Sequence, residues 1–412
     1  MAVARDKLVA ALDVGTSKVC CFIARVGDGG ALRIVGIGHQ LSRGIKGGAV
    51  VDMEETEVSI RAAVDAAERM AGVPVEQVFV NLSAGDPASD LITGEVSVAG
   101  HEIGAVDIQH VLDRGRADFD SAGRDVIHAL PVAYTVDGAV GVADPRGLVG
   151  ERLGVDMHIV TAAPGPVRNL ETCVNRGHLK VASFVLSPYA SGLSALVEDE
   201  RNLGVILLDM GGGTTTISVF VEGSMVFASV IPVGGQHVTN DIARGLLTPV
   251  AHAERMKTLY GSALPSPSDS REMLEVPHVG ESDQDNMTRI PRSMLTGIIQ
   301  PRIEETFELV RDRLAESGFG RMAGGRLVLT GGASQLPGVR ELAGRILDKS
   351  VREGHPENVS GLADATRGPA FSTCAGLLSY AVSAPIEAYA RPAPMMPRGR
   401  FARVGRWLKE NF

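Results

Sequence analysis

Two stretches of the chain repeat one pattern of apolar and polar positions: an apolar strand ending in an aspartate, a glycine-rich turn and a second strand. The first copy runs from Lys7–Val14 (KLVAALDV) into Val19–Val26. The second copy runs from Val205–Asp209 (VILLD) into Ile217–Val221. Apolar runs of this length, bounded by glycine, predict strands. The pattern predicts two β-hairpins and an α/β fold with duplicated halves that close on one ligand from both sides.

The two turns are candidates for binding a phosphate chain. They supply glycines, hydroxyls and one lysine, namely Gly15, Thr16, Ser17 and Lys18 in the first turn, and Gly211, Gly212, Gly213, Thr214 and Thr215 in the second. Glycine lets the backbone approach a ligand closely, and successive N–H groups form a concave anion site. Asp13 and Asp209, at the strand ends, are candidates for holding Mg²⁺ through water. Each hairpin alone is also compatible with an ordinary glycine-rich turn.

A third turn follows near the C-terminal end. Arg326–Gly338 (RLVLTGGASQLPG) has the pattern of a strand, a Gly-Gly turn and a helix start. With the two hairpins, and in this order, it resembles the phosphate, phosphate and adenosine motifs of the actin-like ATPase superfamily. The resemblance implies a two-lobed fold that binds ATP and Mg²⁺ between the lobes, with Gly331, Gly332 and Ser334 against the adenosine.

The remaining elements follow from apolar positions spaced for one helical face or for a strand. Asp52 or Thr56 is the candidate N-cap of the first helix. The predicted helices are Glu57–Ala71, Pro166–Arg176, Ser187–Glu198, His237–Leu247, Ala251–Tyr260, Met294–Ser317 and Phe371–Val382. The predicted strands are Ala31–Gln40, Val78–Ser83, Leu179–Leu186 and Val226–Val233.

The segment 84–163 has a pattern of its own. It is expected to form a small α+β subdomain. Its predicted elements are strands over Leu91–Val98, Val126–Val136 and Met157–Thr161, and a helix over Asp107–Arg116. The connection between Gln40 and the first helix is too short for the subdomain that actin carries there. This displaced subdomain resembles subdomain 1C of the FtsA family of bacterial division actins.

The resemblance implies a division of the whole chain. The expected parts are subdomain 1A (1–83 and 164–196), 1C (84–163), 2A (197–235 and 303–368), 2B (236–302), a returning crossing helix (369–384), a linker (385–399) and a membrane-targeting helix (400–412). Small residues on the two crossing helices, among them Gly192 and Gly376, would allow close packing.

The resemblance also assigns residues of the second lobe. The runs GGQHVTNDIA and KTLYG look like FtsA signatures, which places Gly235 in the nucleotide site and Lys257 near the sugar or base. A solvated helix face is the alternative for Lys257. Hydrolysis needs a group that positions water. The lead-in to the first crossing helix, Ser187–Tyr189, has no acid or glutamine, so at most slow ATP hydrolysis is expected and the catalytic residue is unassigned.

Composition and charge argue against several classes of protein. The chain has 412 residues, 44% of them hydrophobic, and a net charge of −9, which argues against non-specific nucleic-acid binding. No uninterrupted apolar run approaches the roughly 18 residues of a membrane-spanning helix, and a signal-peptide pattern is not expected. The four cysteines, Cys20, Cys21, Cys173 and Cys374, have no paired metal-ligand spacing and are expected to be buried thiols.

The C-terminal segment differs from the rest. A proline-rich stretch precedes FARVGRWLKENF, in which an apolar stripe with tryptophan at its edge opposes cations. From Pro392 onward five cations stand against one acid, a net charge of +4, which leaves −13 for the rest. Such a helix is typical of binding to anionic membranes. The residues expected to bind the membrane are Phe401, Val404, Trp407, Leu408, Phe412, Arg403, Arg406 and Lys409. Docking on the body of the protein is the alternative.

The FtsA resemblance implies a cytoskeletal function. An ATP-bound protein would polymerise on the cytoplasmic face of the inner membrane at the division site and anchor the FtsZ ring. The FtsZ C-terminal tail would bind subdomain 2B, and later division proteins would bind subdomain 1C. Two alternatives stay open: a scaffold for pilus assembly, and a sugar or acetate kinase of the same fold.

Overall fold

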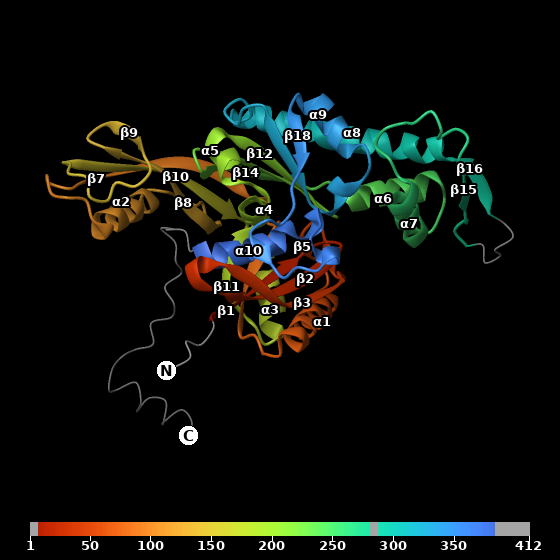
Figure 1. The fold of residues 1–412 in the computed structure, drawn as a ribbon, viewed down its shortest axis with the longest axis horizontal. Coiled ribbons are helices and arrows are strands. Elements are labelled where there is room, and N and C mark those ends of the chain that lie inside the picture. The colour runs from red at the N-terminus through yellow and green to blue at the C-terminus, as the bar shows by residue number, and fades with distance from the viewer. Residues whose placement is uncertain (1–6, 281–286, 384–412) are drawn as a thin grey trace, which may run out of the picture.

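The protein has two stacked lobes, with a smaller region at each end of its long axis (Figure 1). The computed structural model describes residues 7–280 and 287–383. The predicted linker (385–399) and the predicted membrane-targeting helix (400–412) lie outside the described residues. None of the helices in the described ranges is long and apolar enough to cross a membrane.

Lobe 1 is built on a six-stranded sheet. Its strands are β1 (Lys7–Val14), β2 (Lys18–Val26), β3 (Leu32–Leu41), β6 (Gln77–Leu82), β11 (Lys180–Leu186) and β19 (Val359–Ser360). They lie in the order β11-β6-β1-β2-β3-β19. Strands β1, β2 and β3 form an antiparallel meander, and β6 and β11 run parallel to β1. A short hairpin of β4 (Ile45–Lys46) and β5 (Ala49–Val50) precedes the first helix.

Lobe 2 repeats this arrangement. Its strands are β12 (Val205–Met210), β13 (Thr215–Val221), β14 (Ser224–Ile231), β17 (Arg326–Thr330) and β18 (Ser350–Glu353). They lie in the order β14-β13-β12-β17-β18, again an antiparallel meander followed by two parallel strands. The two sheets therefore share strand order and direction, which confirms the predicted duplication and both hairpins.

Helices cover the outer faces of the two sheets. In Figure 1, α1 (Met53–Ala71) and α3 (Pro164–Arg176) lie below lobe 1, and α8 (Arg292–Ser317) and α9 (Val339–Leu347) lie above lobe 2. Helix α1 starts four residues before the predicted Glu57 because Asp52 is the N-cap and its carboxylate accepts hydrogen bonds from the N–H groups of Glu54 and Glu55 (3.0 and 3.1 Å).

Two helices cross between the lobes, α4 (Ser187–Ala195) and α10 (Ser372–Ser383). They pack closely because Gly376 has no side chain: a Cβ there would lie 1.7 Å from the Ala190 carbonyl oxygen. Gly192, by contrast, faces the ring of Phe220 in β13 and not the partner helix.

The predicted helix Ser187–Glu198 is wrong at its C-terminal end. Helix α4 ends at Ala195, Leu196 is extended, and a separate α5 (Glu198–Leu203) follows. The Glu200 carboxylate caps the start of α5 through the Val197 N–H (3.3 Å) and accepts a hydrogen bond from Arg352 Nε (2.6 Å). Arg352 also donates to the free Ala195 carbonyl (2.9 Å). The break is thus fixed by a long-range contact that a local pattern does not contain.

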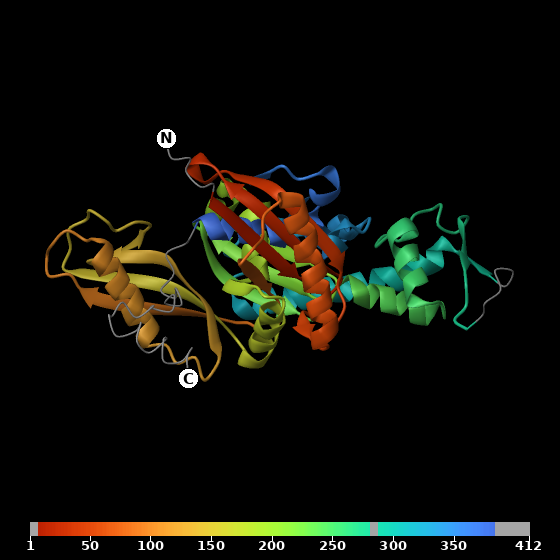
Figure 2. The same ribbon diagram turned by 90° about the horizontal axis from the view of Figure 1, so that it is seen from below.

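The inserted subdomain lies at one end of the molecule (Figure 2). It contains β7 (Ala88–Ser97), α2 (Ala105–Ala117), β8 (Asp125–Val136), β9 (Ala139–Val142) and β10 (Arg152–Ala162), with sheet order β7-β10-β8-β9. Buried histidines join it to both lobes. His128 Nε2 accepts from the Leu186 N–H (2.9 Å), and Ser89 Oγ contacts both His158 Nε2 (2.7 Å) and the Ala228 N–H (2.9 Å). Burial lowers the pKa of His158 to about 3, so this ring is neutral.

The region at the opposite end belongs to the second half of the chain. It comprises α6 (Gly235–Gly245), α7 (Val250–Tyr260), β15 (Met273–Val276), β16 (Thr288–Pro291) and the start of α8. Short 3₁₀ helices at Asp28–Gly30, Gly332–Gln335, Asp364–Thr366 and Pro369–Phe371 complete the described part. All four cysteines are free and buried, as predicted.

Candidate functional site

The two glycine-rich turns have the same backbone and lie against each other. Each is closed by one hydrogen bond, from Gly15 N to Lys18 O (3.0 Å) in lobe 1 and from Gly211 N to Thr214 O (2.8 Å) in lobe 2. A Cβ on Gly212 would lie 1.9 Å from Ser17 Oγ. A phosphate chain held by the backbone of one turn is therefore within reach of the other.

Asp13 and Asp209 lie at the ends of β1 and β12, and both are buried. Burial raises the pKa of Asp13 to about 6; nearby Lys18 opposes this shift and the charge of Asp209 adds to it. The side-chain carboxylate of Asp13 accepts no hydrogen bond from residues 7–280 or 287–383. Two carboxylates whose charges affect each other, one of them without a donor, fit the oxygen ligands that Mg²⁺ prefers.

The surroundings of Asp209 differ from those of Asp13. Its Oδ2 accepts hydrogen bonds from Ser191 Oγ of α4 and from Thr373 Oγ1 of α10 (2.9 Å for Thr373). Burial raises the pKa of Asp209, and the two hydroxyl donors oppose that rise. Both crossing helices therefore contact the acidic residue of lobe 2.

Lys18 is placed by the C-terminal part of the chain. Its ammonium group donates to the carbonyl of Ala370 and lies 4.3 Å from the centroid of the Phe371 ring. A segment just before α10 thus holds the one cation of the first turn, next to Asp13.

The third turn closes against the second. Gly331 has φ +88°, and a Cβ there would lie 2.3 Å from Asp209 Oδ1. The Ser334 hydroxyl is buried and donates to the Gly331 carbonyl (2.7 Å), so it stabilises the turn itself. Gly332 lies beside Ala370. The structure therefore brings Gly331 to Asp209 and Gly332 to Ala370, the residue that holds Lys18, and engages Ser334 within the turn.

Gly235 and Lys257 join this group through the start of α6. The Gly235 N–H donates to the Gly211 carbonyl (2.9 Å). The Lys257 ammonium donates to the Gly235 carbonyl (3.1 Å), to Thr239 Oγ1 (2.8 Å) and to Glu254 Oε2 (2.7 Å). The solvated alternative for Lys257 is wrong, because its side chain is only 17% exposed and points at the helix start.

The last two of the three threonines after the glycines, Thr215 and Thr216, have different surroundings. The Thr215 hydroxyl donates to the Val233 carbonyl (2.8 Å) and is engaged within lobe 2. Thr216 pairs with Asp209 across β12 and β13, so the two side chains share one face of the sheet. The Thr216 hydroxyl is buried and has no hydrogen-bond partner within the described ranges. A buried orphan hydroxyl beside a carboxylate fits a site that receives metal-bound water or a phosphate oxygen.

The lead-in to α4 is a hydroxyl and amide network. Asn81 Oδ1 accepts from the Val14 N–H (2.7 Å), Asn81 Nδ2 donates to Ser187 Oγ (3.2 Å), and Ser83 Oγ lies 2.6 Å from the same oxygen. These groups satisfy one another's hydrogen bonds, and the three side chains are an amide and two hydroxyls.

Sequence reasoning missed three hydroxyls of this site: Ser191, Thr373 and Thr216. Ser191 and Thr373 are polar positions in the two predicted crossing helices, and Thr216 is the residue that a hairpin register places opposite Asp209. That register was the available signal for Thr216, whereas the other two required knowledge of how the helices cross.

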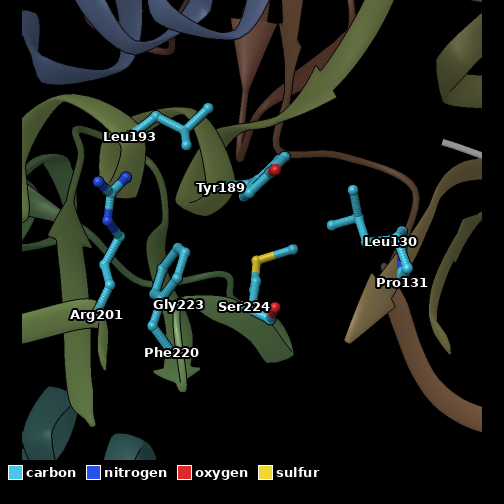
Figure 3. Close-up of a pocket in the computed structure, with 9 residues that line it drawn as sticks. Leu130, Pro131, Tyr189, Leu193, Arg201, Phe220, Gly223 and Ser224 are labelled. Atoms are coloured by element: carbon cyan, nitrogen blue, oxygen red, sulfur yellow. The ribbon is translucent and has the colours of Figure 1, made fainter. Parts of the chain in front are cut away.

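A separate cavity of about 200 Å³ lies at the junction of lobe 2, α4 and the inserted subdomain (Figure 3). Its lining is mainly apolar and includes Leu130, Tyr189, Leu193, Phe220 and Met225. Because Tyr189 and Leu193 lie on the face of α4 opposite Ser191, this cavity is distinct from the site of the two aspartates.

Comparisons with known proteins give one family over the whole chain. Residues 206–376 match the family described as "Cell division protein FtsA", and residues 85–161 match the "SHS2 domain inserted in FTSA". The chain is 47% identical to Cell division protein FtsA of Rhizobium meliloti, over 99% of this chain and 96% of that protein. The same comparison gives 39% for the FtsA of Pseudomonas aeruginosa, over 98% of each chain, and 34% for that of Escherichia coli, over 98% and 96%.

Solved structures confirm the predicted fold. The PilM–PilN type IV pilus biogenesis complex contains a similar chain, with a TM-score of 0.64, 17% identity, and coverage of 91% of this chain and 98% of the other. MreB5 of Spiroplasma citri bound to ADP has a TM-score of 0.55 and 12% identity, over 92% and 97%. At these identities the likeness shows the actin-like ATPase fold and carries no function by itself.

Proposed function

Because this chain belongs to the FtsA family of cell division proteins, we propose that it binds ATP and Mg²⁺ between its two lobes and forms polymers that attach the FtsZ ring to the cytoplasmic membrane. A role in cell division follows from the family. The pilus-assembly alternative rests on a fold likeness at 17% identity, against 34–47% for the FtsA relatives.

The observation that carries the nucleotide site is the meeting of the two hairpins at one place, each with a buried aspartate. Asp13 and Asp209 would hold Mg²⁺ through water, and the backbone of the two turns would bind the phosphates, with Lys18 as a cation beside them. Bound Mg²⁺ would neutralise the phosphate oxygens. Gly331 and Gly332 would lie against the adenosine, and Lys257 near the sugar.

Nucleotide would act mainly as a ligand that holds the lobes together. The first turn comes from lobe 1 and the other two come from lobe 2. ATP would therefore contact both lobes in one closed arrangement and stabilise it. With only hydroxyl and amide groups at the start of α4, hydrolysis is slow. The closed form is the one that polymerises.

The C-terminal sequence supplies membrane attachment in this proposal. A short basic amphipathic helix binds an anionic membrane weakly and reversibly, so stable attachment needs several copies side by side. Polymerisation provides those copies. The FtsZ tail would bind the region of α6, α7, β15 and β16 (subdomain 2B, 236–302), and later division proteins would bind the inserted subdomain (1C, 84–163).

Co-sedimentation with anionic liposomes tests the proposal. The full chain is compared with a chain ending at Arg398, each with and without Mg²⁺–ATP. We expect the full chain to pellet with liposomes in the presence of ATP, and the shortened chain to stay in the supernatant. Neutral liposomes of the same size are the control for charge.

Two results would contradict the proposal. Equal pelleting of both chains would remove the membrane role of the C-terminal sequence. Pelleting of the full chain to the same extent with and without ATP would show that membrane binding does not depend on bound nucleotide. ATP-dependent phosphorylation of a small sugar or acetate would favour the kinase alternative.

A further inference from the structure

Asp209 is held by one hydroxyl from each crossing helix. Ser191 Oγ and Thr373 Oγ1 both donate to Oδ2, and the two hydroxyl oxygens lie 2.9 Å apart. Each hydroxyl has a single proton. When both donate to the ionised carboxylate, neither can also donate to the other. Ser191 and Thr373 are 0% and 8% exposed, so water competes little for these bonds.

The other oxygen of the same carboxylate, Oδ1, accepts no hydrogen bond from the described residues. Oδ1 faces Gly331, where a Cβ would approach within 2.3 Å. Any side chain at this position would cover Oδ1, whereas glycine leaves it free to contact a ligand. The two oxygens of Asp209 are therefore differentiated: Oδ2 is bound by the crossing helices and Oδ1 is available.

We propose that Ser191 and Thr373 are positioning residues of the nucleotide site, which fix the Asp209 carboxylate so that Oδ1 is presented to the water shell of a bound divalent cation. The inference rests on the Mg²⁺–ATP function proposed above. Residues that orient a metal-binding carboxylate reduce the freedom it loses on binding, and their removal typically weakens metal binding about 10- to 100-fold. Asp13 has no such support in the described part of the chain, so this positioning belongs to lobe 2 alone.

The competing explanation is that the hydroxyls only join α4 to α10. Ser194 provides a matched control for it. Ser194 lies on the same helix, is 1% exposed and donates across the helix pair to the Ser372 carbonyl (2.6 Å). Its two acceptors, the carbonyls of Ser191 and Ser372, are backbone groups, and neither belongs to Asp209. Loss of helix packing alone would therefore appear in Ser194→Ala as well.

The experiment measures the Kd of a fluorescent ATP analogue in EDTA and in excess Mg²⁺. The Kd in EDTA divided by the Kd in Mg²⁺ gives the factor by which Mg²⁺ strengthens binding. The variants are Ser191→Ala, Thr373→Val, Thr373→Ser and Ser194→Ala. Valine keeps the shape of threonine without its hydroxyl, and serine keeps the hydroxyl. Thermal unfolding of each variant without nucleotide reports any general loss of packing.

We expect Ser191→Ala and Thr373→Val each to reduce the Mg²⁺-dependent ratio about threefold to tenfold. Thr373→Ser should restore the ratio, and Ser194→Ala should leave it unchanged even if its unfolding temperature falls.

An unchanged ratio in both Ser191→Ala and Thr373→Val would overturn the inference while leaving ATP binding intact. A reduction of equal size in Ser194→Ala would also overturn it, in favour of helix packing. If the unaltered chain showed no Mg²⁺-dependent binding, the proposed function itself would fail, and this inference with it.

Discussion

The turn after β1 presents Thr16, Ser17 and Lys18, whereas the turn after β12 presents three glycines and then Thr214. Their backbones are closed by the same hydrogen bond, and their strands have the same order and direction. What differs is the chemistry: the first turn supplies a cation and hydroxyls, and the second supplies space and bare backbone. Side chains of the first turn occupy the space that the glycines of the second leave.

The aspartates differ in the same way. Asp13 lies opposite Cys20 in the hairpin register, and its carboxylate accepts no hydrogen bond within the described residues. Asp209 lies opposite Thr216 and is held by Ser191 and Thr373. The carboxylate of lobe 2 is therefore oriented by two hydroxyls. The carboxylate of lobe 1 has no such donor and lies beside a lysine. The halves are complementary, so neither lobe alone makes the site.

Replacing either carboxylate should have the largest effect. We expect Asp13→Asn and Asp209→Asn each to weaken Mg²⁺-dependent ATP binding about 10- to 100-fold, because each removes a charged oxygen ligand. Their effects on unfolding without nucleotide should differ. Asp13→Asn removes a buried charge without a donor and should raise the unfolding temperature, whereas Asp209→Asn disturbs two hydrogen bonds and should not. Isothermal titration and thermal unfolding of the two variants check this, and equal shifts in unfolding temperature would contradict the asymmetry.

The contact between the two turns can be disrupted by adding a side chain to a glycine of the second turn. Gly212→Ala places a Cβ against Ser17 Oγ and Cβ (1.9 and 3.0 Å), so we expect ATP binding to weaken about tenfold through overpacking. Adding Ser17→Gly should restore binding. In Gly15→Ala the Cβ meets only the Lys18 carbonyl of its own turn (3.0 Å), so any loss of binding in this variant should not be restored by Ser17→Gly. No rescue by Ser17→Gly would show that the turns do not depend on this contact.

The cation of the first turn has no counterpart in the second. Lys18→Met keeps an apolar side chain of similar length and removes the ammonium group that lies over the Phe371 ring. We expect ATP to bind about five- to tenfold more weakly, in line with the loss of a charge-assisted hydrogen bond. Lys257→Met should cost less, because the charge of Lys257 is already balanced by Glu254. Competition binding with ATP, ADP and AMP separates the two, since only Lys18 should discriminate by phosphate number.

The smallest expected effect is at Thr216. Thr216→Val removes a buried hydroxyl without a partner, so the nucleotide-free protein should be as stable as before or more stable. ATP binding in Mg²⁺ should nevertheless weaken about threefold, the size of one neutral hydrogen bond. Thr215→Val is the matched comparison, because its hydroxyl bonds the Val233 carbonyl and its loss should lower stability. A drop in stability for Thr216→Val would mean that the hydroxyl has a structural partner.

The repeated hydrophobic pattern was sufficient to predict the duplicated fold. Strands ending in Asp13 and Asp209 and bounded by glycine determine both hairpins, because alternation and turn chemistry are local. The end of α4 was predicted wrongly, because the contact between Arg352 and Ala195 joins residues far apart in the sequence.

The residues of the site were likewise predictable only where the sequence signal is local. Glycines and aspartates identified the turns, but local pattern did not indicate that Ser191 and Thr373 meet at one carboxylate oxygen. That arrangement depends on the crossing of α4 and α10, which Gly376 makes possible at close range.

The central claim is that the two lobes bind one metal–nucleotide complex together. A double-mutant cycle on Asp13→Asn and Asp209→Asn tests it most directly, with the ratio of the ATP Kd in EDTA to that in Mg²⁺ measured for the unaltered chain, both single variants and the double variant. If both carboxylates act on one ion, the double variant should lose no more Mg²⁺ dependence than the worse single variant. Losses that add in free energy would show two independent effects and would contradict a shared site.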